Sequence, residues 1–408
     1  MTVPGADSVL VRHGDVGVKS SGVQKRMEGR LRDNLQAMLE RDDIEGLVER
    51  EWGRVIVRTD DAENPGQTAD AACGAATRTF GVVSASSART VDPDFDTICE
   101  TLAEIAPDVY TGGAFAVDAR RSGDVHDFTS HDVNQDGGAA VWHAVADDFE
   151  PEVDLDDPDV TFYIEVREDE AFIFTEKRDG PGGLPLGTQA PLVALISGGI
   201  DSPVAAWLAM KRGSPVVPLY LDLGDYGGPD HRARAELTAE HLQEWAPGFD
   251  LRMRVAPAGP AVKRLGAEVG KTRMLSFRRF MYRVAEHVAE REGAVGIVTG
   301  EAIGQKSSQT ATNLGVVSDA ASLPIHRPLL VLDKQEIIAK ARELGTYRDA
   351  TIDAGCNRLA PGQPLTAADR ESIMLDEPED LFEMARDIAE DVEVVGADED
   401  VADAEVSR

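Results

Sequence analysis

Cysteine, lysine and long apolar runs are scarce in this sequence. The shortage of cysteine and the shortage of long apolar runs each argue against a class of protein. The three cysteines, Cys73, Cys99 and Cys356, lie far apart without metal-ligand spacing, which argues against a disulfide framework and a zinc knuckle. Apolar runs stay well short of the roughly 18 residues of a membrane span. The N-terminus lacks the basic start and apolar core of a signal peptide. We therefore expect a cytoplasmic protein that does not enter a membrane.

Lysine is outnumbered by arginine, nine to thirty-two, and 74 acidic residues face 41 basic ones. The net charge of −33 is typical of a solvated anionic surface in a salt-rich cytoplasm, so we infer a halophilic source. Such a charge by itself argues against nucleic acid as a partner. Residues 251–285, however, carry nine basic residues and a single acidic one, Glu268. This basic island predicts a polyanionic ligand, with a plain surface patch as the alternative.

The length of 408 residues predicts two or three domains. Residues 8–59 are predicted as strand, long helix and strand, and residues 71–177 alternate helices with strands, so two small α/β domains are expected. The glycines and prolines that follow indicate a linker. We divide the chain into these segments: 1–66, 67–178, the linker 179–191, 192–375 and an acidic tail, 376–408.

Beyond the linker the sequence predicts a doubly wound parallel sheet. Its expected strands, such as PVVPLYL and AVGIVTG, are almost continuously apolar, as a sheet buried on both faces requires. Ligands of such sheets bind at the carboxyl ends of the strands. Asp333 is the expected N-cap of the last helix, with Glu336 three residues on. The strands are expected at 192–197, 215–223, 251–257, 294–299 and 324–331, and the helices at 203–212, 231–245, 274–292 and 334–344.

The stretch SGGIDS, residues 197–202, stands at the end of the first of these strands and opens a helix. Two glycines let the backbone approach an anion, the serines offer hydroxyls, and the helix N-terminus supplies free N–H groups and a positive dipole. The stretch lacks the lysine of a Walker loop and contains no G-x-G-x-x-G. It resembles instead the signature of the PP-loop ATP pyrophosphatases, which hold pyrophosphate while they transfer AMP to an oxygen.

Further stretches narrow this resemblance to a family. GGLPLGTQAPLVALISGGIDSPVAAWLAMKRG, SFRRFMYRVAEHVAEREG, VTGEAIGQKSSQTATNL and LPIHRPLLVLDKQEIIAKARELGTY together resemble the tRNA 4-thiouridine synthetase family, also called tRNA sulfurtransferase. VLVRHGDVGVKS resembles the start of its ferredoxin-like domain, and RTFGVVSASSA with AFAVDARRSGDVHDFTSHDVNQDGGAAV resembles its THUMP domain. The resemblance implies an α/β chain with a ferredoxin-like domain at 1–66, a THUMP RNA-binding domain at 67–178 and a PP-loop adenylating domain at 192–375.

The resemblance also implies a role for each matching position. Asp201 is implied as essential to activation, and Cys356 as the thiol used in sulfur transfer. Arg278 stands where the family usually has a lysine, so the charge is kept but a planar fork replaces a point charge. The expected ATP-binding residues are Leu195, Ile196, Ser197, Gly198, Gly199, Ser202, Tyr220, Leu221, Arg278, Gly300 and Gln309. The expected RNA-binding residues are Lys19, Arg120, Arg121 and Arg279.

The sulfur chemistry depends on Cys356. From its turn-rich surroundings alone, Cys356 is equally compatible with a reactive thiol and with a cysteine that has no chemical role. The resemblance favours the reactive thiol. Relatives with an iron–sulfur cluster have a C-x-x-C where this sequence has Met274 and Phe277, so no cluster is expected. No rhodanese domain follows either, so we expect an external donor, a cysteine desulfurase persulfide or sulfide. No protein metal site is expected, because the histidines of the second segment lack ligand spacing: His126, His131 and His143.

We therefore predict an enzyme that uses ATP and Mg²⁺ to adenylate a uridine of tRNA, at position 8 in this family, and then transfers sulfur to it. Two alternatives stay open: sulfur transfer to a carrier protein for thiamine thiazole synthesis, and a non-catalytic tRNA-binding protein. The identity of the thiolated product distinguishes the first, and ATP–pyrophosphate exchange distinguishes the second. Besides tRNA and the sulfur donor, a sulfur-carrier protein and a second copy of the chain in a homodimer are kept as candidate partners.

Overall fold

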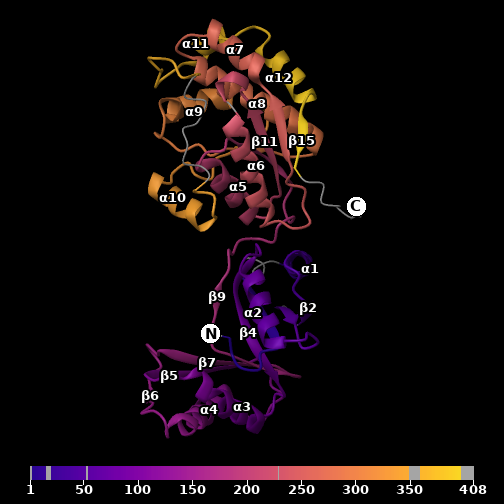
Figure 1. Ribbon diagram of the computed structural model, residues 1–408, viewed down its shortest axis with the longest axis vertical. Coiled ribbons are helices and arrows are strands. Elements are labelled where there is room, and N and C mark those ends of the chain that lie inside the picture. Colours follow the sequence, from indigo (N-terminus) through magenta and orange to yellow (C-terminus); the bar gives the residue numbers. More distant parts are fainter. Residues whose placement is uncertain (1, 15–19, 52–53, 228, 349–358, 397–408) are drawn as a thin grey trace. The chain divides into compact units, whose positions relative to one another are not determined.

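The computed structural model describes residues 2–14, 20–51, 54–227, 229–348 and 359–396 (Figure 1). Two compact units make up the chain, Met1–Pro185 and Leu186–Arg408. Two predicted site residues, Lys19 and Cys356, lie outside the described residues. No helix in the described part of the chain is both long and apolar enough to cross a bilayer.

The N-terminal unit is built on one mixed sheet whose described strands follow the order β2-β3-β1-β4-β8-β7-β5-β6, with β9 paired to β4. The strands are β1 (Ser8–His13), β2 (Leu47–Glu51), β3 (Arg54–Arg58), β4 (Val82–Val91), β5 (Ala114–Arg121), β6 (Glu152–Val153), β7 (Val160–Val166), β8 (Ala171–Phe174) and β9 (Arg178–Asp179). The helices are α1 (Ser21–Arg41), α2 (Pro65–Ala76), α3 (Phe95–Val109) and α4 (Ser130–Val145).

Strand β4 joins the two expected N-terminal domains into one sheet. Its first part pairs antiparallel with β1, and Arg89–Val91 pair with β8. The predicted boundary at residue 66 falls at the start of α2, which packs on β1 and β4. A ten-residue strand that is buried along most of its length can serve both halves of a sheet, so residues 67–91 contribute to the first half as well as to the second.

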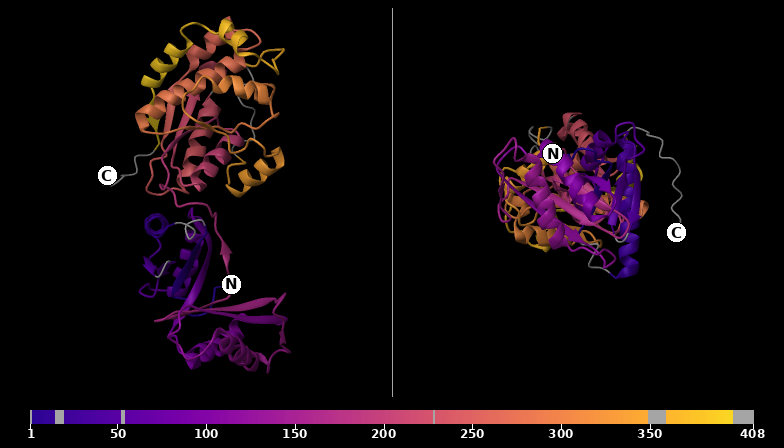
Figure 2. Two further views of the ribbon diagram at one scale, coloured as in Figure 1. Left: turned by 180° about the vertical axis from the view of Figure 1, so that it is seen from behind. Right: turned by 90° about the horizontal axis from the view of Figure 1, so that it is seen from below.

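All four helices cover the same face of this sheet. Their apolar residues form one core with Val9, Val11, Val55 and Val57 of the first half and with the alternate residues of β5 and β7. In Figure 1 α3 and α4 lie on one side of β5 and β7, and the view from behind in Figure 2 agrees. The period of two along a strand leaves the remaining side chains on the opposite face.

The C-terminal unit confirms the predicted doubly wound parallel sheet. Its described strands follow the order β14-β13-β10-β11-β12-β15, and β15 alone among them pairs antiparallel. The strands are β10 (Leu192–Ile196), β11 (Val216–Asp222), β12 (Met253–Pro257), β13 (Ile297–Val298), β14 (Ile325–His326) and β15 (Glu393–Val395). The helices are α5 (Asp201–Lys211), α6 (Pro229–Gln243), α7 (Gly259–Glu268), α8 (Arg273–Glu292), α9 (Ala311–Ser318), α10 (Lys334–Glu343), α11 (Arg370–Asp376) and α12 (Leu381–Glu390), with short 3₁₀ turns at Gly224–Tyr226 and Ser307–Gln309.

Several parts of this unit differ from the pattern expected from the sequence, among them the additional helices α7, α9 and α11. The strand expected at 324–331 is confined to β14, because the chain turns after Arg327. Helix α12 and strand β15 lie within the segment predicted as an acidic tail. Leu381, Ala385 and Ala389 recur every fourth residue and pack on α8, so the acidic side chains are left on the outer face.

Candidate active site

The SGGIDS loop connects β10 to α5 at the carboxyl end of the central strand. The Ser197 backbone N–H donates to Ser202 Oγ over 3.1 Å, which ties the two ends of the loop together. Gly198 has φ of +65°, and a Cβ there would lie 3.0 Å from the His231 carbonyl oxygen, so α6 closes one side of the loop. No side chain of the described residues caps the N-terminus of α5. Its first N–H groups and its dipole are therefore available to an anion.

Gly300 brings the loop after β13 against the SGGIDS loop. A Cβ on Gly300 would lie 2.8 Å from the Asp201 carbonyl carbon and 2.9 Å from the Ser202 nitrogen. Only glycine allows this approach without a backbone shift. Residues 198–202 and Gly300 are thus brought together although about a hundred residues separate them in sequence.

The next strand, β11, places Tyr220 and Leu221 beside this loop. Tyr220 pairs in register with Ile196 of β10, and both strand ends are buried. Burial, followed by the charge of Asp222, raises the pKa of Tyr220 to about 12. The phenol is therefore neutral at physiological pH. Leu195 and Ile196 end β10 directly beneath the loop.

Asp201 forms an ion pair that the sequence did not predict. Its Oδ1 lies 2.6 Å from Nζ of Lys334, the first residue of α10. Asp333 caps this helix, accepting from the backbone N–H groups of Gln335 and Glu336, as the sequence predicted. The N-cap signal fixed where α10 begins, but which carboxylate the next lysine contacts depends on packing across the fold.

Arg278 lies in a polar network at the same edge of the sheet. Its guanidinium forms an ion pair with Glu301 and donates from Nε to Ser308 Oγ over 3.3 Å. The amide of Gln309 lies between Arg278 and Ala302: oriented to satisfy both, its oxygen accepts from Arg278 at 3.0 Å and its nitrogen donates to the Ala302 carbonyl at 3.1 Å. Arg278 and Gln309, both predicted to bind ATP, therefore contact each other.

Glu301 is the centre of this network and was not singled out from the sequence. It is 3% exposed and accepts from Tyr282 (2.6 Å), Thr299 (3.0 Å) and Arg327 Nε (2.7 Å). Burial would raise the pKa of Glu301, but the charges of Arg278 and Arg327 outweigh it and hold that pKa below its usual range. A buried carboxylate between two guanidiniums leaves one positive charge in excess beside the SGGIDS loop, which suits an anionic ligand.

Most of the basic island is compensated by acidic residues of the same unit. Acidic residues from outside residues 251–285 pair with much of it: Glu292 with Arg254, Asp380 with Arg264, Glu377 with Arg279, Glu286 with Arg283 and Glu301 with Arg278. The charge count along the sequence suggested a polyanion site because these partners lie elsewhere in the sequence.

Arg279 shows this correction most clearly. It is 3% exposed, its Nε lies 2.7 Å from Glu377 Oε1, and its guanidinium stacks on Phe382. The side chain therefore fastens α8 to the segment around α12, and we assign it a packing role in place of the predicted RNA contact.

The other two described residues that were predicted to bind RNA, Arg120 and Arg121, differ in their exposure to solvent. Arg120 is exposed and lies on the helix-free face of the N-terminal sheet, in register with Glu165 of β7. Arg121 points the other way and donates to the carbonyls of His126 (2.7 Å) and Phe128 (2.5 Å), which fixes the following loop. Arg120 alone of this pair is thus presented to solvent.

The two described cysteines are poor nucleophiles. Cys73 is buried, and burial raises the pKa of its thiol. Burial, together with Asp136 and Asp96, raises the pKa of Cys99. Both thiols are therefore protonated near neutral pH. Among the described residues no group of three or more His, Cys, Asp or Glu side chains could hold a metal ion.

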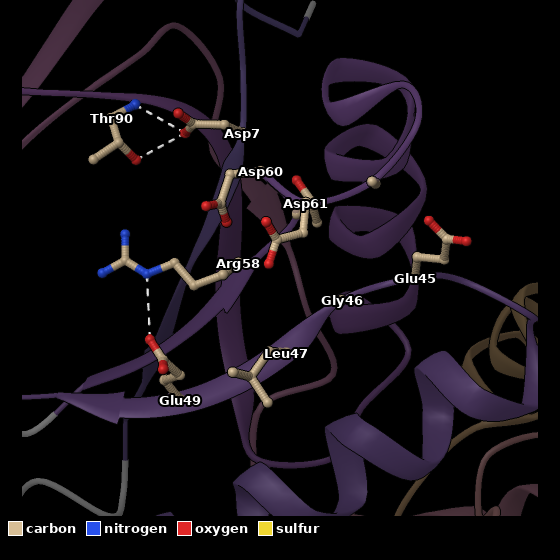
Figure 3. A pocket seen from close by; sticks show the side chains of 11 residues that line it. Asp7, Glu45, Gly46, Leu47, Glu49, Arg58, Asp60, Asp61 and Thr90 are labelled. Atoms are coloured by element: carbon tan, nitrogen blue, oxygen red, sulfur yellow. Dashed lines mark hydrogen bonds and ion pairs between the residues drawn. The ribbon is translucent and has the colours of Figure 1, made fainter.

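A cavity of about 610 Å³ lies in the N-terminal unit, and its lining is acidic. Figure 3 shows the carboxylates of Asp60 and Asp61 beside Arg58, whose Nε lies 3.4 Å from Glu49. Asp7 accepts from both the backbone N–H and the hydroxyl of Thr90. Such a lining repels phosphates, so this cavity is not a nucleotide site.

Family models match the chain in three consecutive segments. The ThiI ferredoxin-like domain matches residues 8–86, the THUMP domain matches 92–176, and the model described as thiamine biosynthesis protein (ThiI) matches 187–382. The first match ends within β4, in agreement with the shared strand described above.

Whole-chain relatives agree with these matches. A probable tRNA sulfurtransferase of Halobacterium salinarum is 66% identical over 96% of this chain and 98% of its own length. One of Methanosarcina mazei is 40% identical over 90% of both chains. A crystal structure of a 4-thiouridine synthetase–RNA complex with bound ATP superposes with a TM-score of 0.82 and 28% identity, covering 96% of this chain and 99% of that one.

Proposed function

We propose, from the premise that this chain belongs to the ThiI family of tRNA sulfurtransferases, that it forms 4-thiouridine at position 8 of tRNA by ATP-dependent sulfur transfer. The solved relative with RNA and bound ATP supports both ligands for this chain. The observation that carries the proposal is the SGGIDS loop, closed by Gly300 and pinned through Asp201 to Lys334. A tRNA substrate also supports the proposal that the reaction takes place in the cytoplasm.

The loop suits the first chemical step, in which the uridine 4-oxygen attacks the α-phosphate of ATP and pyrophosphate leaves. The N-terminus of α5 and the N–H groups of the loop would bind the departing pyrophosphate. Their N–H groups donate hydrogen bonds to its oxygens, and the positive end of the helix dipole stabilises its negative charge. The Lys334 ammonium would stabilise the same charge from α10. Tyr220 and Leu221 would line the adenosine side, where a neutral phenol is compatible with a purine.

Mg²⁺ fits this site as an ion that binds chiefly to substrate phosphates. Such ions keep several waters and need one or two protein carboxylates. Asp201 offers one carboxylate at the loop, held in place by Lys334. When bound, the ion would neutralise charge on the leaving pyrophosphate.

Sulfur transfer is the second step: hydrosulfide attacks C4 and AMP leaves, or the outer sulfur of a persulfide attacks C4, AMP leaves, and an external thiol then cleaves the resulting disulfide to release the thiouridine. We assign Cys356 to this step, and the raised pKa values of Cys73 and Cys99 support the choice because neither thiol ionises readily. The sulfur itself would come from an external donor, a cysteine desulfurase persulfide or sulfide. Absence of an iron–sulfur cluster stays a prediction, based on Met274 and Phe277.

Nucleoside analysis of tRNA tests the proposal. Liquid chromatography with mass spectrometry should detect 4-thiouridine in cells with the wild-type gene and none with Asp201→Ala. Cys356→Ser should also abolish it, whereas the matched variant Cys99→Ser should leave it unchanged. Persistence of 4-thiouridine with Asp201→Ala would overturn the proposal. Persistence with Cys356→Ser alone would make free sulfide the donor.

A second candidate function is sulfur delivery to a carrier protein for thiamine thiazole synthesis, favoured by the description of the matching family model as a thiamine biosynthesis protein. The adenylated group would then be the C-terminal glycine of the carrier. The two functions differ in product: thiolated tRNA in one case, a carrier thiocarboxylate in the other. Mass spectrometry of a purified carrier after incubation with the chain, ATP and a sulfur donor separates them.

A further inference from the structure

The N-terminal sheet has a second, smaller apolar layer on the face that the helices do not cover. It consists of the strand residues Leu10, Ile56, Ala88, Phe172 and Phe174, with Tyr163 beside them. The five strand residues are almost completely buried, and Tyr163 partly so, although all six lie on the helix-free face. Something other than a helix must therefore cover them.

Basic side chains provide this cover. The guanidinium of Arg12 lies 4.8 Å from the ring centre of Phe174, and Nζ of Lys177 lies 3.5 Å from that of Tyr163. Long basic side chains can lay their aliphatic parts on rings while the charged ends remain near water. The face is thus apolar beneath and cationic above.

The centre of this face holds more positive than negative charge. Glu165 lies 3.1 Å from Arg12, 3.2 Å from Arg54 and 3.5 Å from Arg167, and we call these four residues the Glu165 cluster. Three positive charges meet one negative charge, so two remain uncompensated. Within the described part of the chain, Arg54 Nη1 and Arg167 Nε are also buried without a hydrogen-bond partner. Arg120 lies opposite Glu165 in the register of β5 and β7 and is exposed, with Asp118 3.6 Å away as its partner.

The titration of neighbouring groups agrees with an excess of positive charge. Burial lowers the pKa of Arg54, and the charges of Arg167 and Arg12 lower it further against the attraction of Glu165. Burial and the charge of Arg12 likewise lower the pKa of Lys177. An anion at this place would relieve the repulsion among these cations.

Arg58 provides a contrast on the same strand and the same face. Arg54 shares one carboxylate with two other arginines, whereas Arg58 lies within 3.4 Å of three carboxylates, those of Glu49, Glu51 and Glu170. Arg58 also lines the acidic cavity of Figure 3. Strand β3 therefore has excess positive charge at Arg54 and excess negative charge around Arg58. An anionic ligand would bind at the Arg54 end of the strand and be repelled from the Arg58 end.

We propose that the Glu165 cluster, with Arg120 and Lys177, binds backbone phosphates of the tRNA. Guanidinium groups match phosphate oxygens in a two-pronged geometry, and the Arg54 side chain, 31% exposed, presents such a group at the surface of the cluster. The inference rests on the proposed function, since the phosphates are those of the tRNA substrate. It assigns the contact to residues of both N-terminal domains, which β4 joins in one sheet.

Salt dependence of tRNA binding tests the site. Fluorescence anisotropy with labelled tRNA measures the affinity across a series of KCl concentrations in which circular dichroism shows the chain folded. Each lost phosphate contact reduces the slope of log K against log salt by about one. Arg54→Gln and Arg167→Gln should each produce this reduction, and Arg54→Lys should restore most of the slope because it keeps the charge.

Arg58→Gln is the matched control and should retain the wild-type slope, because its cation is already compensated. If Arg54→Gln and Arg167→Gln both fold and keep the wild-type slope, the cluster serves packing alone and the inference fails. A slope that falls equally in Arg58→Gln also overturns it, because the loss would then reflect general charge. If the wild-type chain binds no tRNA, the proposed function fails first, so the two failures are distinguishable.

Discussion

Gly300 shows how one missing side chain can shape the candidate active site. A Cβ there would meet the backbone of Asp201 and Ser202, so Gly300→Ala must push the two loops apart. We expect about a 10²-fold loss of tRNA-dependent ATP–pyrophosphate exchange, since small displacements of reacting groups have effects of this size. Gly315→Ala, in open space within α9, is the control and should keep full exchange. Full exchange by Gly300→Ala would show that the contact is not needed.

Lys334 holds Asp201 and is placed to stabilise the leaving pyrophosphate. We expect Lys334→Gln to lower ATP–pyrophosphate exchange by roughly 10²-fold, the usual effect of removing one donor from developing charge. Lys340→Gln lies on the same helix, pairs with Glu343 and should leave exchange unchanged. Equal losses in the two variants would indicate damage to α10 rather than a specific role of Lys334.

Glu301 couples the stability of the C-terminal unit to pH. Its pKa is lowered in the folded chain, so its stabilising contribution is present above the ordinary glutamate pKa of about 4.3 and is lost as the pH falls through the lowered value. Glu301→Gln should cost about 3 kcal/mol at pH 7, because two partly buried guanidiniums lose their buried carboxylate. Urea unfolding at pH 7 and at pH 3, well below the ordinary glutamate pKa, measures this difference. A cost that is the same at both pH values would contradict the assignment.

At the scale of elements, the cap of α10 links stability to the site. Asp333→Ala removes two hydrogen bonds to the first turn and should cost about 1 kcal/mol. It should also weaken ATP–pyrophosphate exchange, because Lys334 is the first residue of that helix. Asp369→Ala removes a comparable cap from α11 and should cost a similar amount without affecting exchange. Thermal unfolding and exchange assays on both variants separate the two effects.

The sequence predicted the elements of the C-terminal sheet better than its edges. Strands β10 and β11 are buried on both faces, and their almost continuous apolar residues distinguish them from loops. Strand β15 is short and begins with Glu393, and β14 has two residues, so neither carries a strong pattern. The SGGIDS loop was evident because its glycines serve local geometry.

Contacts across the fold were the part of the site that the sequence could not give. Lys334 and Asp201 are 133 positions apart, and nothing near either residue indicates the other. Arg279 was predicted as an RNA contact because it lies in the basic island, but Glu377, which follows α11, and Phe382 of α12 enclose it. Arg120 and Arg121 are adjacent in sequence, and the period of two along β5 alone decides which one meets solvent.

At the scale of the whole molecule, the segment predicted as an acidic tail contains α12 and β15 among its described residues. Truncation after residue 380 removes α12 and β15, which uncovers the face of α8 that packs on Leu381, Ala385 and Ala389. We expect the melting temperature to fall strongly and the truncated chain to aggregate. The buried Leu381 alone contributes about 2 kcal/mol, and Arg279 loses its ring partner. Truncation after residue 396 removes charge but none of these contacts and should melt close to the full chain. Differential scanning calorimetry of both truncations decides the matter: equal melting temperatures would mean that α12 and β15 do not support the sheet.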